Sequence, residues 1–314
     1  MQSAPPDTAV ERFRGDLTKL IGPEGGRLGL AVSGGPDSLA LLLLAQSAGF
    51  DCAAATVDHG LRAEGAAEAQ SVKDLCSSLQ LPHMVLRLGP PEKGNLSDWA
   101  RRARYQALTD WMQAERLSFL LTAHHADDQL ETIIMRLNRS AGVGGLAGIR
   151  AKRGQLVRPL LTWRKAELEA LVSGCGVVAV NDPTNRDDRF DRARLRKNLE
   201  GAHWLDPIAA SRSAAALLEA ENALRWAAKE VEGQRVEETD GVVSFDPHDL
   251  PPELIRRILV ACLRRITPDA TPRGEALDRL MIALMQGQVM TLSGVKCAGG
   301  KEWHFTLAPP RRTV

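Results

Sequence analysis

The first two-thirds of the chain alternate between short apolar runs and longer segments with an apolar face. Four runs have the length and composition of buried strands, and they span Arg27–Val32, Cys52–Val57, His83–Leu88 and Ser118–Ala123. A helical pattern follows each of these runs. Because strands that alternate with helices form parallel sheets covered on both faces, the pattern predicts an α/β fold with a doubly wound, mostly parallel sheet.

The pattern changes after the fourth of these strands and its helix. Residues 142–161 are rich in glycine and basic residues and predict a loop and a hairpin, and residues 177–185 predict a last strand with a turn. Helical patterns then cover residues 163–174, 201–229, 251–266 and 274–286, and the tail at 289–307 reads as a hairpin that turns at 298–300. We therefore expect two domains, residues 1–200 and 201–314, of which the second is smaller and mainly helical.

Composition places the chain among globular proteins. Hydrophobic residues make up 44% of it and charged residues 25%, which is the usual range. The longest apolar run, Leu39–Ala45, has seven residues, whereas a membrane span needs roughly 20. The N-terminus has no apolar stretch typical of a signal peptide. We expect a cytoplasmic protein with no membrane association.

Charge and cysteine content exclude some functions. The 40 basic and 39 acidic residues give a net charge of +1, which excludes nucleic-acid binding through bulk positive charge but allows a local basic patch. The cysteines are far apart in sequence and form no CxxC pair, so we interpret them as core residues and not as metal ligands. They are Cys52, Cys76, Cys175, Cys262 and Cys297.

The sharpest chemical signal is the segment Ser-Gly-Gly-Pro-Asp-Ser at residues 33–38, between the first strand and its helix. Two glycines allow a tight turn that brings backbone N–H groups against an anion, and the helix N-terminus adds its positive dipole. Asp37 would repel a phosphate unless a cation lies between them, so we expect Mg²⁺ there. The alternative is an ordinary capped turn, and no Walker sequence is present.

Two histidines and three carboxylates lie within eight residues after the fourth strand. Asp128 and Glu131 are three residues apart, so they share one face of the helix that begins there, at the edge where open α/β sheets bind ligands. Such a pair suits an ammonium group, although acidic residues also stabilise a helix N-terminus. Zinc is disfavoured because HExxH is absent and the side chains of His124 and His125 diverge. His124 either orients a phosphate or closes the strand end.

In this order, the motifs of the chain resemble those of the tRNA(Ile)-lysidine synthetases, a family of PP-loop ATP pyrophosphatases. The motifs are Ser33–Ser38, Val57–Arg62, Ala103–Tyr105, Thr122–Thr132 and Arg158–Leu161. The resemblance implies a ligase that joins free L-lysine to C2 of the wobble cytidine of a tRNA(Ile) with the anticodon CAU. It also implies that ATP first adenylates the cytidine and that the lysine amine then displaces AMP. A PP-loop tRNA thiolase and a non-catalytic nucleotide- or RNA-binding module are the alternatives.

Spacing and resemblance together assign residues to roles. The catalytic set is Asp37, His124, Asp128 and Glu131, with Asp37 as the Mg²⁺ ligand. The ATP-binding set is Ser33, Gly34, Gly35, Pro36, Asp37, Ser38, His59, Arg62 and Arg104. Arg158, Arg192, Arg194 and Arg196 are expected to contact tRNA phosphates, with a solvated helix face as the alternative. Ala193 stands where the family usually has an asparagine, and a homodimer is an assembly that the sequence leaves open.

Overall fold

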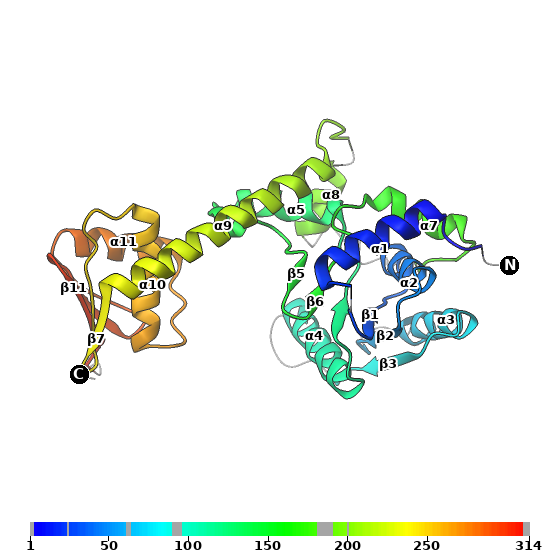
Figure 1. Ribbon diagram of the computed structural model, residues 1–314, viewed down its shortest axis with the longest axis horizontal. Coiled ribbons are helices and arrows are strands. Elements are labelled where there is room, and N and C mark those ends of the chain that lie inside the picture. The colour runs from blue at the N-terminus through cyan, green and yellow to red at the C-terminus, as the bar shows by residue number, and fades with distance from the viewer. Residues whose placement is uncertain are drawn as a thin grey trace. The chain divides into compact units, whose positions relative to one another are not determined.

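The computed structural model describes residues 3–23, 25–60, 64–89, 96–180, 191–199 and 201–309 (Figure 1). The chain divides into two compact units, Met1–Leu218 and Glu219–Val314. The division falls inside helix α9, Pro207–Arg235. The boundary that the sequence predicts at residue 200 stays a prediction, and α9 begins after it, at Pro207.

A six-stranded sheet forms the centre of the first unit, with the strand order β3-β2-β1-β4-β6-β5. The strands are β1 Leu28–Ala31, β2 Cys52–Asp58, β3 His83–Arg87, β4 Phe119–Leu121, β5 Lys152–Arg153 and β6 Leu156–Val157. Neighbouring strands pair in parallel, except for the antiparallel hairpin of β5 and β6. The order reverses between β1 and β4, and such a reversal marks the ligand-binding edge of an open sheet. The predicted fold class is confirmed.

Helices cover both faces of this sheet. The described helices of this unit that precede α9 are α1 Asp7–Ile21, α2 Pro36–Ser47, α3 Glu64–Ser78, α4 Leu96–Ala114, α5 Ala126–Leu137, α6 Val143–Leu146, α7 Lys165–Gly174 and α8 Asp191–Leu199. Helices α1, α2, α3 and α7 share one hydrophobic core, and α4 packs against the other face through Leu108, Trp111 and Met112. None of the described helices is long and apolar enough to cross a membrane.

Two parts of the first unit differ from the sequence prediction. Helix α1 was not predicted, although its buried Val10, Phe13 and Leu17 follow helical spacing. The predicted strand at residues 177–185 is wrong for 177–180, which form no strand. Instead, the Val180 N–H donates to the carbonyl of Gly34 at 2.9 Å, so this segment is held by the phosphate loop and not by the sheet. Residues 181–185 lie outside the described residues.

The second unit packs an antiparallel sheet, in the order β7-β8-β11-β10-β9, against helices α10 Pro252–Ile266 and α11 Gly274–Met285. Its strands are β7 Val236–Thr239, β8 Val242–Phe245, β9 Val289–Leu292, β10 Val295–Ala298 and β11 Trp303–Leu307. The helices match the pattern, but the sheet is larger than the predicted hairpin. Strands β7 and β8 are only four residues long, and their turn at Asp240 and Gly241 was not recognised from the sequence.

Candidate active site

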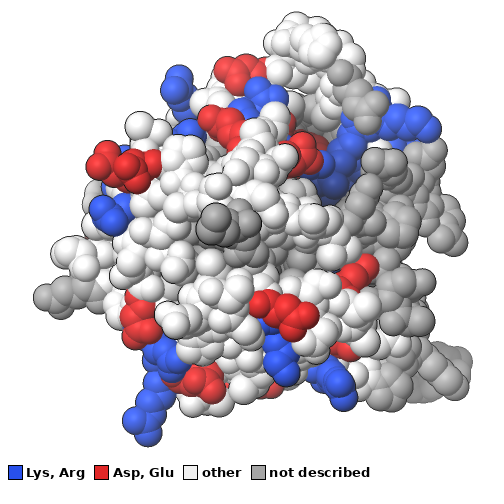
Figure 2. All heavy atoms as spheres, turned by 90° about the vertical axis from the view of Figure 1, so that its right-hand side faces the viewer, with Lys and Arg blue, Asp and Glu red and all other residues white. Residues whose placement is uncertain are grey.

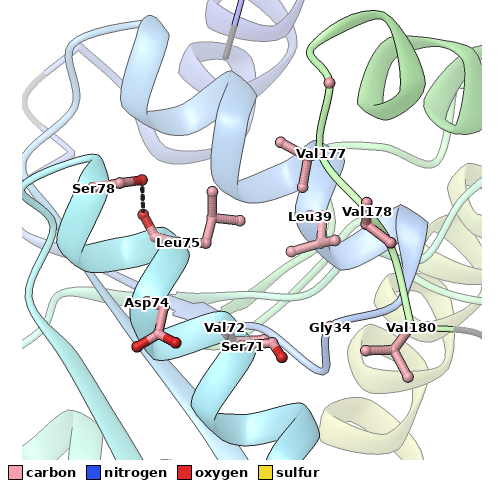
Figure 3. Close-up of a pocket in the computed structure, with 11 residues that line it drawn as sticks. Gly34, Leu39, Ser71, Val72, Asp74, Leu75, Ser78, Val177, Val178 and Val180 are labelled. Carbon is pink, nitrogen blue, oxygen red and sulfur yellow. Dashed lines mark hydrogen bonds between the residues drawn. The ribbon is translucent and has the colours of Figure 1, made fainter. Parts of the chain in front are cut away.

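The phosphate loop lies at the carboxyl end of β1 and leads into α2, as the sequence predicts. Gly34 adopts a φ of +85°, and a Cβ atom there would lie 3.2 Å from Val180 Cγ2 and 3.3 Å from Val72 Cγ2. Figure 3 shows Gly34 between these two valines, one from α3 and one from the segment after α7. Both the backbone conformation and the close packing therefore require glycine at this position.

Two serines hold the shape of the loop. Ser38 Oγ accepts a hydrogen bond from the Ser33 N–H at 3.1 Å and donates one to the Gly35 carbonyl at 2.9 Å. Gly35 is the N-cap of α2, and no side chain in the described part of the chain caps that helix end. The N–H groups of the first turn of α2 are therefore available to an anion.

Asp37, in the first turn of α2, has one carboxylate oxygen that no described residue contacts through a hydrogen bond. Its Oδ1 is buried and accepts no hydrogen bond from any described residue, and its Oδ2 lies 3.6 Å from His125 Nε2. A buried acceptor without a donor is unfavourable, and a cation ligand resolves this. No cluster of three His, Cys, Asp or Glu side chains among the described residues can hold a metal. Asp37 therefore fits Mg²⁺, which commonly takes one or two carboxylates together with phosphates and water.

His125 connects the phosphate loop with helix α5. The residue is the N-cap of α5, where its Nδ1 accepts from the Asp128 N–H at 3.3 Å while Asp128 Oδ2 accepts from the His125 N–H at 3.2 Å. Burial alone would lower the pKa of His125, but the contact with Asp37 and the charges of nearby carboxylates raise it above its ordinary value. His125 was not predicted to have a role, although a residue just before a predicted helix occupies the N-cap position.

His124 and His125 have different hydrogen-bond partners. His124 Nδ1 lies 3.0 Å from Thr122 Oγ1. Burial, together with the positive charges of Arg158 and Arg192, lowers the pKa of His124 to about 4 despite the opposing effect of Asp128. His124 is therefore neutral at pH 7 and contributes hydrogen bonds but no charge.

The predicted carboxylate pair, Asp128 and Glu131, is present on one face of α5 and is paired with two arginines of α8. Arg192 Nε donates to one oxygen of Glu131 at 2.6 Å, and Arg196 Nε donates to the other at 2.6 Å. Both arginines also reach Asp128 Oδ1, at 3.3 and 3.1 Å. Burial would raise the pKa of Asp128, but His125 and Arg192 outweigh it and lower the pKa.

Asp127 has a separate role beside this pair. Its Oδ2 accepts from the Lys165 N–H at 2.8 Å, and its carboxylate also accepts from the Arg164 guanidinium at 3.3 Å. Asp127 therefore stabilises the start of α7, which is the effect of an acidic residue at a helix N-terminus.

The remaining predicted residues are spread around this centre. Arg104 donates to His59 Nε2 at 3.1 Å, so these two members of the ATP-binding set are in contact. Arg158 is buried and donates to the Arg150 carbonyl at 2.7 Å. Arg194 is exposed and pairs with Asp191 at 2.5 Å. Arg62 lies outside the described residues. The roles of these residues in binding ATP or tRNA stay predictions.

The surface charge agrees with the neutral composition. On the face shown in Figure 2, basic and acidic side chains are interspersed among uncharged ones. Binding to a polyanion would therefore depend on particular arginines and not on the overall charge.

Comparison with known proteins gives a consistent family. The PP-loop domain family matches residues 9–202. A tRNA(Ile)-lysidine synthase of Novosphingobium aromaticivorans is 44% identical over 97% of this chain and 95% of its own length. A tRNA(Ile)-lysidine synthase of Zymomonas mobilis is 37% identical over 93% of this chain and 92% of its own length.

The fold is also found among solved structures. The U34-tRNA thiolase of Methanococcus maripaludis, solved with its [4Fe-4S] cluster, superposes with a TM-score of 0.56 at 18% identity and covers 68% of this chain and 80% of its own. At this identity the likeness shows the fold alone.

Proposed function

Because this chain belongs to the tRNA(Ile)-lysidine synthase family of PP-loop proteins, we propose that it joins free L-lysine to C2 of the wobble cytidine of a tRNA(Ile) with the anticodon CAU. The observation that supports this reaction is the junction at His125. This residue contacts Asp37 of the phosphate loop on one side and Asp128 of the carboxylate pair on the other. The proposed ATP site and the proposed site for an ammonium group would therefore lie next to each other.

In the first step of the proposed reaction, O2 of the cytidine attacks the α-phosphorus of ATP, and pyrophosphate leaves. The uncapped N–H groups at the start of α2 and the hydroxyl of Ser33 would bind the departing pyrophosphate. Mg²⁺, when bound at Asp37, would offset negative charge on the phosphates. The product of the step is a cytidine adenylated at O2, which has a good leaving group on C2.

In the second step, the side-chain amine of lysine attacks C2, the bond from C2 to O2 breaks, and AMP leaves with that oxygen. Asp128 and Glu131 would bind the ammonium form of lysine. Deprotonating that ammonium at pH 7 costs roughly 4 to 5 kcal/mol from its reference pKa of about 10.4, and nearby carboxylates raise its pKa further. The pair therefore accounts for recognition of lysine better than for its activation.

The tRNA is the largest substrate in this proposal, and its phosphates require arginine partners. Arg192, Arg194 and Arg196 project from α8 beside the carboxylate pair, and the first and last of these contact it. We place the reaction in the cytoplasm because tRNA is modified there.

The thiolase alternative lacks suitable cysteines. All five cysteines are buried. Burial, with a smaller effect of Asp51 on Cys52, raises the pKa of both Cys52 and Cys76 to about 12. Sulfur transfer and cluster binding use the thiolate form, which such buried thiols do not reach near neutral pH. The buried Asp37 Oδ1, which no described residue contacts through a hydrogen bond, favours an enzyme that holds a cation with ATP over a module that binds RNA alone.

Pyrophosphate release tests the proposed reaction order. The purified protein would be mixed with ATP, Mg²⁺ and a tRNA(Ile) transcript, with and without L-lysine. We expect one equivalent of pyrophosphate per enzyme without lysine and continued turnover with lysine, since adenylation precedes attack by the amine. A transcript with uridine in place of the wobble cytidine serves as the control and should release none. Release that needs lysine but no tRNA would indicate activation of the amino acid and would refute the proposal.

A further inference from the structure

Among the described residues, helix α8 is held to the rest of the first unit by charge and not by buried apolar side chains. None of its nine residues is buried, whereas a helix in a globular protein usually buries an apolar stripe. Its ion pairs with the described residues run from Arg192 and Arg196 to α5, beside which it lies in Figure 1, and from Asp191 to Arg139 at 3.5 Å. Such contacts are open to competition from other charged ligands.

The two guanidinium groups of α8 cover the carboxylates of α5. The side chains of Glu131 and Asp128 are only 6% and 12% exposed, whereas those of Arg192 and Arg196 are 38% and 31% exposed. Arg192 also donates to the Asp128 carbonyl at 3.1 Å. The arginines therefore occupy the oxygens that the proposed function gives to a lysine ammonium, while their own outer surfaces face solvent.

We propose that α8 is a latch on the lysine site and that tRNA phosphates release it; this inference rests on the proposed function. The latch consists of Arg192 and Arg196 bound to Asp128 and Glu131. Guanidinium groups bind phosphate with the same bidentate geometry as carboxylate. A bound tRNA therefore competes for both arginines, and the carboxylates are free for lysine only once the tRNA is in place.

The exchange replaces two guanidinium groups beside the carboxylates with one ammonium group. When the arginines move to phosphates, Asp128 and Glu131 become two neighbouring anions without these partners, which is unfavourable. A lysine ammonium restores one of the two positive charges while His125 still contacts Asp128, so tRNA favours lysine binding. By linkage, lysine favours tRNA binding by the same factor. The latch thus excludes free lysine from the site until the cytidine that it must attack has arrived.

Equilibrium dialysis of labelled L-lysine, without ATP so that no turnover occurs, tests the latch. The full-length protein would be compared alone, with tRNA(Ile) transcript, and as the double variant Arg192→Gln/Arg196→Gln. We expect the transcript to lower the lysine Kd of the wild type at least tenfold. The double variant should bind lysine with that improved affinity without tRNA. Lys197→Gln, which removes a positive charge from an exposed position of the same helix, should keep the tRNA dependence of the wild type.

Equal lysine affinity of the wild type with and without tRNA would overturn the latch, as would a folded double variant that binds lysine no better than the wild type. Circular dichroism establishes whether the double variant is folded, and if it is not, the wild-type comparison decides alone. A parallel incubation of the wild type with tRNA, lysine and ATP separates the two proposals. Lysidine formed despite tRNA-independent lysine binding refutes only the latch, whereas no lysidine refutes the proposed function.

Discussion

Replacing Glu131 with glutamine tests the lysine site most sharply. Glutamine keeps the size of the side chain and one acceptor oxygen but removes the charge. In the structure both Glu131 oxygens accept hydrogen bonds of 2.6 Å from guanidinium groups, so the position binds cationic donors closely. A hydrogen bond to a charged group contributes about 1.5 to 3 kcal/mol. At roughly 1.4 kcal/mol per factor of ten, Glu131→Gln should weaken lysine use about ten- to a hundredfold.

The assay separates lysine use from adenylation. The lysine KM would be measured at saturating tRNA, where the latch is released, and the pyrophosphate burst would be measured without lysine. The KM should rise, and the burst should be unchanged because no contact joins Glu131 to the phosphate loop in the described part of the chain. Glu169→Gln, at an exposed carboxylate that pairs with Lys165, is the matched control. If the burst falls as much as lysine use, Glu131 belongs to the ATP site and the reasoning is wrong.

Three further substitutions probe other parts of the account. Asp37→Asn should leave the fold intact and slow pyrophosphate release at least a hundredfold, which corresponds to about 2.7 kcal/mol in the activation barrier. Near-normal release by the folded variant would exclude a metal ligand at Asp37. His125→Ala removes the N-cap of α5 and should lower the free energy of unfolding in urea by about 1 to 2 kcal/mol. His125→Asn should restore most of this loss because asparagine caps well. Equal losses for the alanine and asparagine variants would contradict the capping role. In the second unit, buried Glu221 accepts from Arg257 at 2.7 Å, and the hydrogen bonds from Arg257 lower the pKa of Glu221 below 4.5. A lowered pKa stabilises the folded state above pH 4.5, and this stabilisation is lost as the pH falls through the folded value. Glu221→Gln should therefore lower the free energy of unfolding by about 1 to 2 kcal/mol near pH 7 and by progressively less in acid. A loss that does not change with pH would refute the ion pair.

Local sequence patterns were sufficient to predict the sheet and the phosphate loop. The first strand and the loop are neighbours in sequence, so the position of Asp37 at the start of α2 follows directly from the chain order. Asp128 and Glu131 share a helix face by spacing alone. These parts of the site depend on contacts within a few residues.

The partners of these groups were not predictable because they lie far away in sequence. Arg192 and Glu131 are 61 residues apart, and no periodicity relates α8 to α5. The sequence therefore assigned the carboxylates to lysine and the arginines to tRNA without indicating that they contact each other. Likewise, the valine-rich run after α7 has the composition of a strand, but at residues 177–180 it hydrogen bonds to Gly34 of the loop.

The most direct test of the central proposal is mass analysis of the wobble nucleoside of a tRNA(Ile) transcript after incubation with the protein, ATP, Mg²⁺ and L-lysine. We predict that the cytidine gains one lysine and loses one water, and that the product requires ATP, lysine and the wobble cytidine. Each modified tRNA should be accompanied by one AMP and one pyrophosphate. An unchanged cytidine from active, folded protein, or replacement of the C2 oxygen by sulfur, would contradict the account.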